Sequence, residues 1–187
     1  DIEGTTAELS PFERARLRAI TSEEMGWGDS GLAISLGVAN FHKTFAMMSG
    51  RPALIDRFVR GGQDEIGCWA VTEPDHGSNP SGMVTTFQDK GDHYLLNGAK
   101  MWISNSPLAD VAVVWAKAEN TEGRIHGLLV ERGMEGFSTP TTHGKLSLRA
   151  SPTGELVFDN VKVPKANLLP NKSGLGAPLG CLDSARY

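Results

Sequence analysis

Residues 69–79 read Trp69-Ala70-Val71-Thr72-Glu73-Pro74-Asp75-His76-Gly77-Ser78-Asn79, an apolar run that enters a tight polar turn. Proline and glycine favour a rigid turn, which leaves backbone N–H groups and two hydroxyls exposed at its lip. Such a lip can approach a planar ring or a phosphate closely and hydrogen-bond to it. Taken alone, the composition favours the simpler interpretation of a strand followed by a solvent-exposed turn.

A second informative stretch follows and reads Asn97-Gly98-Ala99-Lys100-Met101-Trp102-Ile103-Ser104-Asn105. The dipeptide Asn97-Gly98 is a turn signal, and it leads to an indole beside a hydroxyl residue. Taken alone, Trp102 is more typical of a core than of a cofactor site, because most aromatic side chains are structural.

The residues before Glu65 have the periodicity of helices. Ser10-Pro11-Phe12-Glu13 is a capping box with proline at the first helical position. Gly26 and Gly28 are expected to end this helix. Asp29-Ser30 can cap the next one.

The second predicted helix is apolar around much of its circumference, which indicates burial. Its apolar residues are Leu32, Ile34, Leu36, Val38, Ala39, Phe41, Phe45 and Met48. A third, short helix follows Arg51-Pro52 and ends at Gly61-Gly62.

From Glu65 onward, short β-type runs broken by Gly, Pro, Asn and Asp replace the helical periodicity. Lys90-Gly91-Asp92 is expected to form a hairpin turn, and residues 164–178 form a linker rich in glycine and proline. The pattern predicts an antiparallel barrel or sandwich. Its strands are expected at residues 68–72, 84–88, 93–96, 111–116, 125–130, 137–141 and 155–163.

Composition and charge argue against several classes of protein. Hydrophobic residues make up 40% and charged residues 21%, which is ordinary for a soluble globular chain. No apolar run approaches the ~18 residues that a membrane span needs. The net charge of −4, without a basic stripe, argues against a nucleic-acid partner. Cys68 and Cys181 cannot make a disulfide framework, and none of the five histidines has metal-ligand spacing.

Together the two quoted stretches resemble the acyl-CoA dehydrogenase family. Its middle domain carries Thr-Glu-Pro-x-x-Gly-Ser before Asp or Asn, and later Asn-Gly-x-Lys-x-Trp/Tyr-Ile-Thr/Ser-Asn. The glutaryl-CoA dehydrogenase-like subgroup is the most similar, on residues 102–110, 144–151 and 179–187.

The resemblance implies an α+β fold in three parts. Residues 1–64 would belong to an N-terminal helical domain, and residues 65–170 would form an antiparallel β-barrel-like middle domain. Residues 171–187 would be a linker and the truncated start of a C-terminal helical domain.

The resemblance also implies FAD as the cofactor and an acyl-CoA as the substrate. Thr72 would hydrogen-bond the pyrimidine edge of the flavin, Trp102 would flank the ring, and Ser78 would lie where flavin and acyl-CoA meet. The expected cofactor contacts are Trp69, Ala70, Val71, Thr72, Gly77, Ser78, Trp102, Ile103 and Ser104. The expected substrate contacts are Ser78, Leu182, Asp183 and Arg186, the last because a guanidinium suits the phosphates of CoA.

The implied reaction is α,β-dehydrogenation of an acyl-CoA thioester with FAD as hydride acceptor. In the family the base is a glutamate of the C-terminal helical domain, so Glu73 is not expected to take that role. The chain is expected to end before that glutamate, and by itself it is expected to be inactive and to bind FAD weakly. The family arginine that pairs with a glutaryl carboxylate aligns with Ala33, which predicts a neutral acyl group.

The resemblance further implies an electron-transferring flavoprotein or similar acceptor, a homotetramer, and a cytoplasmic location (the mitochondrial matrix in a eukaryote). Two alternatives stay open. One is a flavin-dependent monooxygenase or oxidase on the same scaffold, against which Asp183 and Arg186 argue. The other is a non-catalytic binding module.

Overall fold

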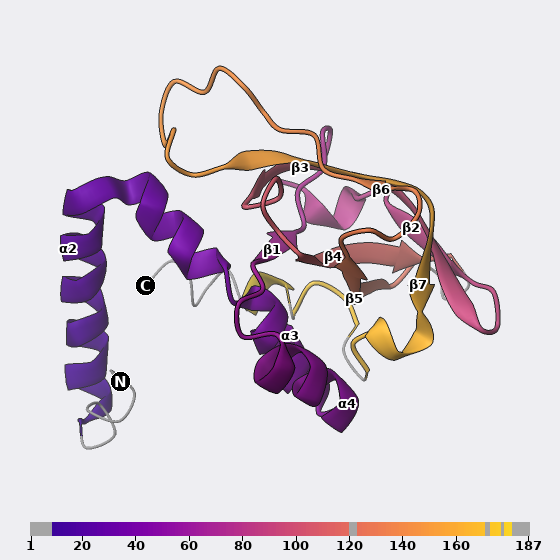
Figure 1. Cartoon of the computed structure of the whole chain (residues 1–187), viewed down its shortest axis with the longest axis horizontal. Coiled ribbons are helices and arrows are strands. Elements are labelled where there is room, and N and C mark those ends of the chain that lie inside the picture. The colour runs from indigo at the N-terminus through magenta and orange to yellow at the C-terminus, as the bar shows by residue number, and fades with distance from the viewer. Residues whose placement is uncertain (1–8, 120–122, 171–172, 177, 181–187) are drawn as a thin grey trace.

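The computed structural model of the chain describes residues 9–119, 123–170, 173–176 and 178–180. Helices lead into one curled seven-stranded sheet, which Figure 1 shows beside the long helix α2. The helical elements are α2 (Pro11–Val38), α3 (Phe41–Ser49), α4 (Pro52–Ile55), a π-helical turn (Asp56–Gly61) and two 3-10 turns (Pro80–Gly82 and Lys165–Asn167). The strands are β1 (Gly67–Ala70), β2 (Thr86–Asp89), β3 (His93–Ser104), β4 (Val111–Ala118), β5 (Ile125–Glu131), β6 (Phe137–Ser138) and β7 (Thr153–Pro164).

The sheet is mixed rather than purely antiparallel. β1 and β2 run parallel to the same edge of β4, whereas β5 covers the other edge and all remaining pairs are antiparallel. β1 reaches β4 through a connection that contains the whole β2–β3 hairpin, which is long enough for parallel pairing. The predicted α+β fold with a barrel-like β unit is therefore confirmed, but the pairing is only partly antiparallel.

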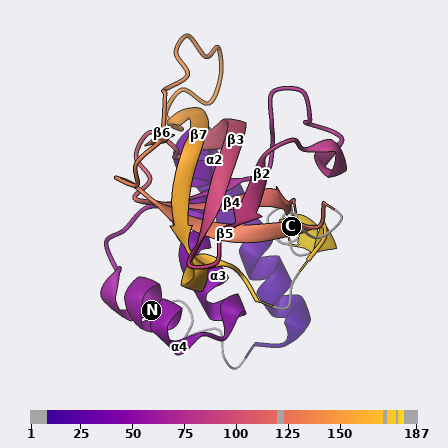
Figure 2. The same cartoon turned by 90° about the vertical axis from the view of Figure 1, so that its right-hand side faces the viewer.

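β4 is buried on both faces and separates two apolar clusters. Ala112, Val114 and Ala116 point into the curl of the sheet. Val111, Val113 and Trp115 point the other way, against α3 and α4. Figure 2 shows β3 and β7 crossing β4 and β5 steeply, so the sheet encloses the first cluster. This two-sided burial explains why residues 111–116 of β4 form a continuous apolar run, which ends at Lys117, rather than an alternating one.

The start and the bend of α2 follow the sequence prediction. The capping box is present: Glu13 N donates to Ser10 Oγ, and Ser10 N donates to Glu13 Oε2. At Asp29 the backbone leaves the helical region, with φ −160° and ψ 112°. Asp29 Oδ1 accepts from Leu32 N at 2.9 Å and so caps the second half of the helix.

The second predicted helix is two helices, and its predicted burial is wrong in the first of them. The helix breaks between Val38 and Phe41, where the Ala39 carbonyl accepts from Gly67 N of β1 at 2.6 Å. Phe45 in α3 is fully buried. In the second half of α2 only Gly31 is buried, because most of this helix lies away from the sheet (Figure 1) and contacts the β unit near Gly31 and Ser35. Leu32, Ile34 and Leu36 are exposed.

Asn97-Gly98 is not a turn. Both residues lie inside β3, at a register shift against β7 between Leu96 and Gly98. Gly98 has φ 134°, and a Cβ there would come within 2.6 Å of Thr85 Oγ1. The glycine therefore permits a close approach of two strands at a β-bulge. The Lys90-Gly91-Asp92 turn between β2 and β3 is confirmed.

The predicted linker is partly docked on the sheet. Asn167 Nδ2 donates to the Leu129 carbonyl at 2.9 Å, and Leu169 N donates to the Gly127 carbonyl at 2.9 Å. Leu169 is buried in the cluster beneath α3 and α4. The glycine-rich composition did not reveal this anchored segment.

A buried histidine gives the fold a pH dependence. His42 is fully buried against the Phe58 ring. Burial, with a smaller effect of Lys43, lowers the pKa of His42, and Glu65 and Asp110 oppose the shift only in part. The unfolded chain binds this proton below about pH 6.5 and the folded chain does not. The free energy of unfolding should therefore fall as the pH drops below about 6.5 toward the folded pKa.

Urea unfolding of the chain at pH 7.5 and 5.5 measures this dependence. The His42→Gln variant serves as the comparison, because glutamine does not titrate. We expect a smaller loss of stability between the two pH values in the variant. Equal losses in both proteins would contradict the prediction.

Candidate functional site

The two motif stretches meet at one cavity of about 320 Å³ at the rim of the sheet. All of the predicted cofactor residues except Ala70 line it, and Ala70 is buried in the core. The lining residues are Val38, Phe41, Trp69, Val71, Thr72, Gly77, Ser78, Pro80, Trp102, Ile103, Ser104 and Leu179. Residues from both halves of the sequence pattern therefore form one surface, together with the end of α2 and the start of α3.

A buried ion pair holds the two stretches together. Lys100 Nζ lies 2.8 Å from Glu73 Oε1, and both side chains are almost completely buried. The carboxylate also accepts from Val84 N at 2.6 Å and from Thr85 N at 3.0 Å. Lys100 Nζ donates in addition to the Val71 carbonyl at 3.2 Å. The polar turn is thus tied to β3 by hydrogen bonds to both charged groups.

Both members of this pair are charged near neutral pH. Burial disfavours the carboxylate, but the bonds from Lys100, Thr85 and Val84 outweigh it and hold the pKa of Glu73 below its usual value. Burial lowers the pKa of Lys100 to about 8, although Glu73 opposes this shift. Glu73 is therefore a structural carboxylate enclosed by its partners, and it is not placed to take a proton from a ligand.

A strained bulge presents Trp102 to the cavity. Met101 N donates to the Thr72 carbonyl at 2.9 Å, and the pairing of β3 with β7 shifts register between Lys100 and Ile103. Trp102 has φ 62°, which is a rare conformation for an aromatic residue, and its side chain is 56% exposed. Such strain persists where the surrounding structure enforces it, and it is concentrated at functional sites.

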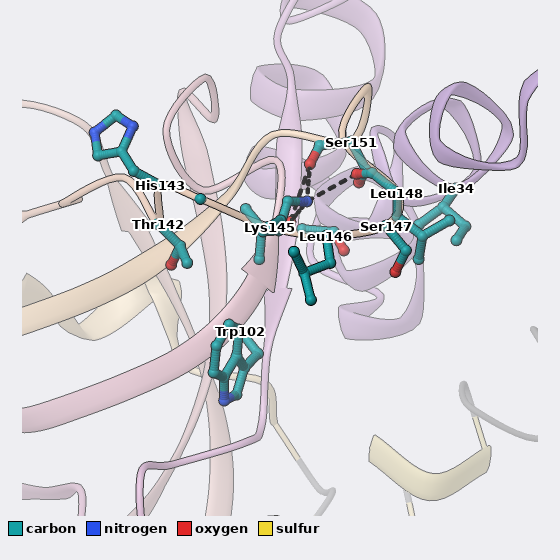
Figure 3. Close-up of a pocket in the computed structure, with 12 residues that line it drawn as sticks. Ile34, Trp102, Thr142, His143, Lys145, Leu146, Ser147, Leu148 and Ser151 are labelled. Atoms are coloured by element: carbon teal, nitrogen blue, oxygen red, sulfur yellow. Dashed lines mark hydrogen bonds between the residues drawn. The ribbon is translucent and has the colours of Figure 1, made fainter.

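A second cavity of about 470 Å³ adjoins the first and shares Trp102 and Ser104 with it. Its other walls are Ile34 of α2 and the loop at residues 142–151, which Figure 3 shows in close-up. Lys145 Nζ fixes this loop by donating to Leu148 O at 2.9 Å, Ser151 O at 2.5 Å and Thr153 Oγ1 at 2.8 Å. All three N–H donors of the ammonium group are therefore used in hydrogen bonds to neutral oxygen atoms.

Sequence reasoning missed several residues of this region. It assigned no role to Lys100 or Asn105, although both belong to the quoted motif, and it did not find the second cavity. The Gly144–Ser151 stretch was a usable signal, because it is one of the segments that resemble the glutaryl-CoA dehydrogenase-like subgroup. The predicted substrate residues Leu182, Asp183 and Arg186 lie outside the described residues, whereas Ser78 is exposed at the first cavity.

The described part of the chain offers neither a metal-binding cluster nor a membrane-spanning helix. It contains no group of three His, Cys, Asp or Glu residues that could hold a metal ion. None of the helices described above is both long and apolar enough to cross a membrane.

The helical segment, the curled mixed sheet and the motif-lined cavity define a two-part α+β architecture that known proteins share. The family model described as acyl-CoA dehydrogenase, middle domain, matches residues 68–161. The chain belongs to the acyl-CoA dehydrogenase family.

Individual relatives support the subgroup resemblance. A glutaryl-CoA dehydrogenase from Desulfococcus multivorans is 39% identical over 175 residues, which cover 89% of this chain and 44% of the relative. A mitochondrial isovaleryl-CoA dehydrogenase from Pongo abelii is 44% identical over 126 residues, which cover 65% of this chain and 30% of the relative. The crystal structure of a Mycobacterium smegmatis glutaryl-CoA dehydrogenase in complex with FADH2 superposes with a TM-score of 0.79 at 44% identity, covering 88% of this chain and 43% of that one. The chain thus spans less than half the length of these relatives.

Removing one member of the buried pair should destabilise the fold strongly. Glu73→Gln or Lys100→Met alone leaves an unpaired buried charge, which costs about 3–5 kcal/mol. The double variant should lose much less than the sum of the two, because neither charge remains. Denaturant unfolding of the four proteins measures this coupling. The control is Lys165→Met, which removes the partner of Asp89 in a pair at the surface and should change stability little. Additive losses at Glu73 and Lys100 would contradict the prediction.

Proposed function

We propose that this chain forms one wall of a site for FAD and an acyl-CoA thioester, in an enzyme that oxidises the α,β bond of the acyl group. One observation carries the proposal: two motifs that residues 80–96 separate in the sequence line a single cavity at the rim of the sheet. The Mycobacterium smegmatis neighbour, whose structure was solved with FADH2, supports it.

The residues present fit a flavin ring. The first cavity combines an exposed indole, Trp102, with the hydroxyls of Thr72, Ser78 and Ser104. An indole can stack on a planar ring, and hydroxyls can bond to its heteroatoms. Trp69 Nε1 is buried at the same cavity without a partner among the described residues. When bound, FAD supplies the hydride acceptor that the reaction needs.

The role of this chain is placement rather than proton transfer. No Asp or Glu of the described residues lines either cavity. Glu73, the acidic residue of the motif, is enclosed by Lys100 and two backbone N–H groups. A base needs to lie within hydrogen-bond reach of the proton that it removes. We therefore propose that the α-proton acceptor lies outside the described residues.

The acyl group is proposed to lie against the second half of α2. Ile34 lines the larger cavity and Val38 the smaller one. No Lys or Arg occurs between Asp29 and His42, and Ala33 occupies the position that the resemblance aligns with a carboxylate-binding arginine. Lys145 lines the larger cavity, but three oxygen atoms already hold its ammonium group. These features support a neutral acyl group, although two of the relatives reported above are glutaryl-CoA dehydrogenases.

The full-length protein should therefore prefer a neutral acyl-CoA, such as butyryl-CoA or isovaleryl-CoA, to glutaryl-CoA. An unpaired carboxylate in an apolar site is strongly disfavoured, so we expect a ratio of kcat/KM of at least about a hundredfold. Steady-state assays with an artificial electron acceptor measure it. The Ala33→Arg variant should gain activity on glutaryl-CoA. A wild-type protein that prefers glutaryl-CoA would refute the neutral-acyl proposal.

FAD binding tests the site itself. Trp102→Ala in the full-length protein should weaken FAD binding about tenfold, because the ring loses an aromatic wall. Calorimetric titration of the apoprotein with FAD gives the affinity. Trp27→Ala is the matched control, since Trp27 is 90% exposed and lines neither cavity. A full-length protein without FAD affinity would overturn the proposed function.

The electron acceptor and the assembly of the whole enzyme are likewise proposals that rest on the family resemblance. We propose an electron-transferring flavoprotein as the acceptor and a homotetramer as the assembly, as the family resemblance implies. The predicted location, cytoplasmic or in the mitochondrial matrix, stays a prediction.

A further inference from the structure

Asn105 directly follows the residues that line both cavities, and it is almost completely buried. It has φ 65°, in the left-handed region that asparagine tolerates better than most residues. Its N–H donates to the Pro152 carbonyl at 2.7 Å, and its carbonyl accepts from Leu108 N and Ala109 N at 2.8 Å each. The backbone of Asn105 is therefore held firmly at the end of β3.

The side chain of Asn105 reaches the end of α2. Its Nδ2 donates to the Ser35 carbonyl at 2.8 Å. Ser35 lies in the last turn of this helix, where carbonyls run out of intrahelical donors. Ser35 Oγ also donates to Ser151 Oγ at 3.3 Å, and the Ala39 carbonyl accepts from Gly67 N. The end of the helix is thus anchored to the sheet by polar contacts rather than by apolar burial.

These contacts connect the two sides of the cavities. Ile34 and Val38 of α2 form one side, and Trp102 and Ser104 of β3 form the other. Asn105 is adjacent to Ser104 in the chain and bonded to Ser35, so one amide spans both sides. A glycine would satisfy the backbone conformation equally well. The Oδ1 of this amide is buried without a partner among the described residues, which is unfavourable. The bond from Nδ2 to the Ser35 carbonyl offsets that cost and gives the amide a reason to be there.

We infer that Asn105 is a positioning residue, which holds the end of α2 at a fixed distance from Trp102 and Ser104 and thereby sets acyl-group selectivity. The inference rests on the proposed function. Without the amide, only the Ser35–Ser151 and Gly67–Ala39 bonds and little apolar burial hold the end of α2, so it can shift more easily. The distance between the end of α2 and β3 then varies, so the acyl group is bound less tightly and less selectively. The contacts made by the reacting atoms do not involve α2 and are kept. Ground-state binding and selectivity should suffer more than the chemical step.

The test compares Asn105→Gly with Asn160→Gly in the full-length, FAD-loaded protein. Asn160 also has a positive φ, 52°, but it is exposed and lines neither cavity. In Asn105→Gly we expect KM for the preferred acyl-CoA to rise about tenfold with kcat changed less than about threefold. The preference over the next-best acyl-CoA should fall toward unity. The absorbance spectrum of the bound flavin should be unchanged, and the control should show none of these effects.

Amide hydrogen exchange gives a readout that does not depend on turnover. Exchange over residues 31–41 should be faster in Asn105→Gly than in the control, with β4 and β5 unaffected. If Asn105→Gly does not fold, Asn105→Asp decides the question. Aspartate keeps the shape of the side chain but replaces the donor with an acceptor, so it should reproduce the rise in KM and the faster exchange.

The outcomes distinguish a failure of the positioning role of Asn105 from a failure of the proposed function. Matching KM, selectivity and exchange in the Asn105 variant and the control would overturn the inference, and so would a fall in kcat alone. A wild-type protein that neither binds FAD nor oxidises acyl-CoAs would overturn the proposed function instead. Faster exchange in the Asn105 variant would in that case still support the anchoring of α2.

Discussion

The buried pair of Glu73 and Lys100 is the constraint on which the site depends. Two charges without access to water are tolerable only when each is surrounded by partners. Here those partners are backbone groups from two parts of the β unit, Val71 after β1 and the adjacent residues Val84 and Thr85 before β2. Satisfying the pair therefore fixes the polar turn against β3. The same bonds remove Glu73 from any chemical role.

Backbone strain at Trp102 is the second feature on which the site depends. The register shift between β3 and β7 forces this residue to a positive φ and turns its indole out of the sheet. The conformation is unfavourable, but the surrounding contacts enforce it. The Met101–Thr72 bond lies on one side of it, and the buried turn at Asn105 lies on the other. The exposed ring thus belongs to a rigid support, which suits a wall against which a planar cofactor is placed.

Prediction from the sequence was good where a feature depends on neighbouring residues. The capping box at Ser10, the helix restart at Asp29 and the hairpin at Gly91 all form as expected, because side chains a few residues apart set their geometry. Prediction was poorer where a segment distant in the chain sets the local conformation or the burial of a residue. Asn97-Gly98 has the composition of a turn, yet the approach of Thr85 makes it a bulge within a strand. The apolar second half of α2 indicated burial, but no described element covers most of it.

The sequence by itself determined the order of the elements, the family resemblance and eight of the twelve residues that line the first cavity, because motif residues and local propensities can be recognised one segment at a time. Only the tertiary structure decided the parallel pairing of β1 with β4, the partnership of Glu73 with Lys100, the second cavity and the bond from Asn105 to Ser35. Each of these joins segments that are distant in the chain. Their contacts depend on strand register and on the curl of the whole sheet, which local patterns do not encode.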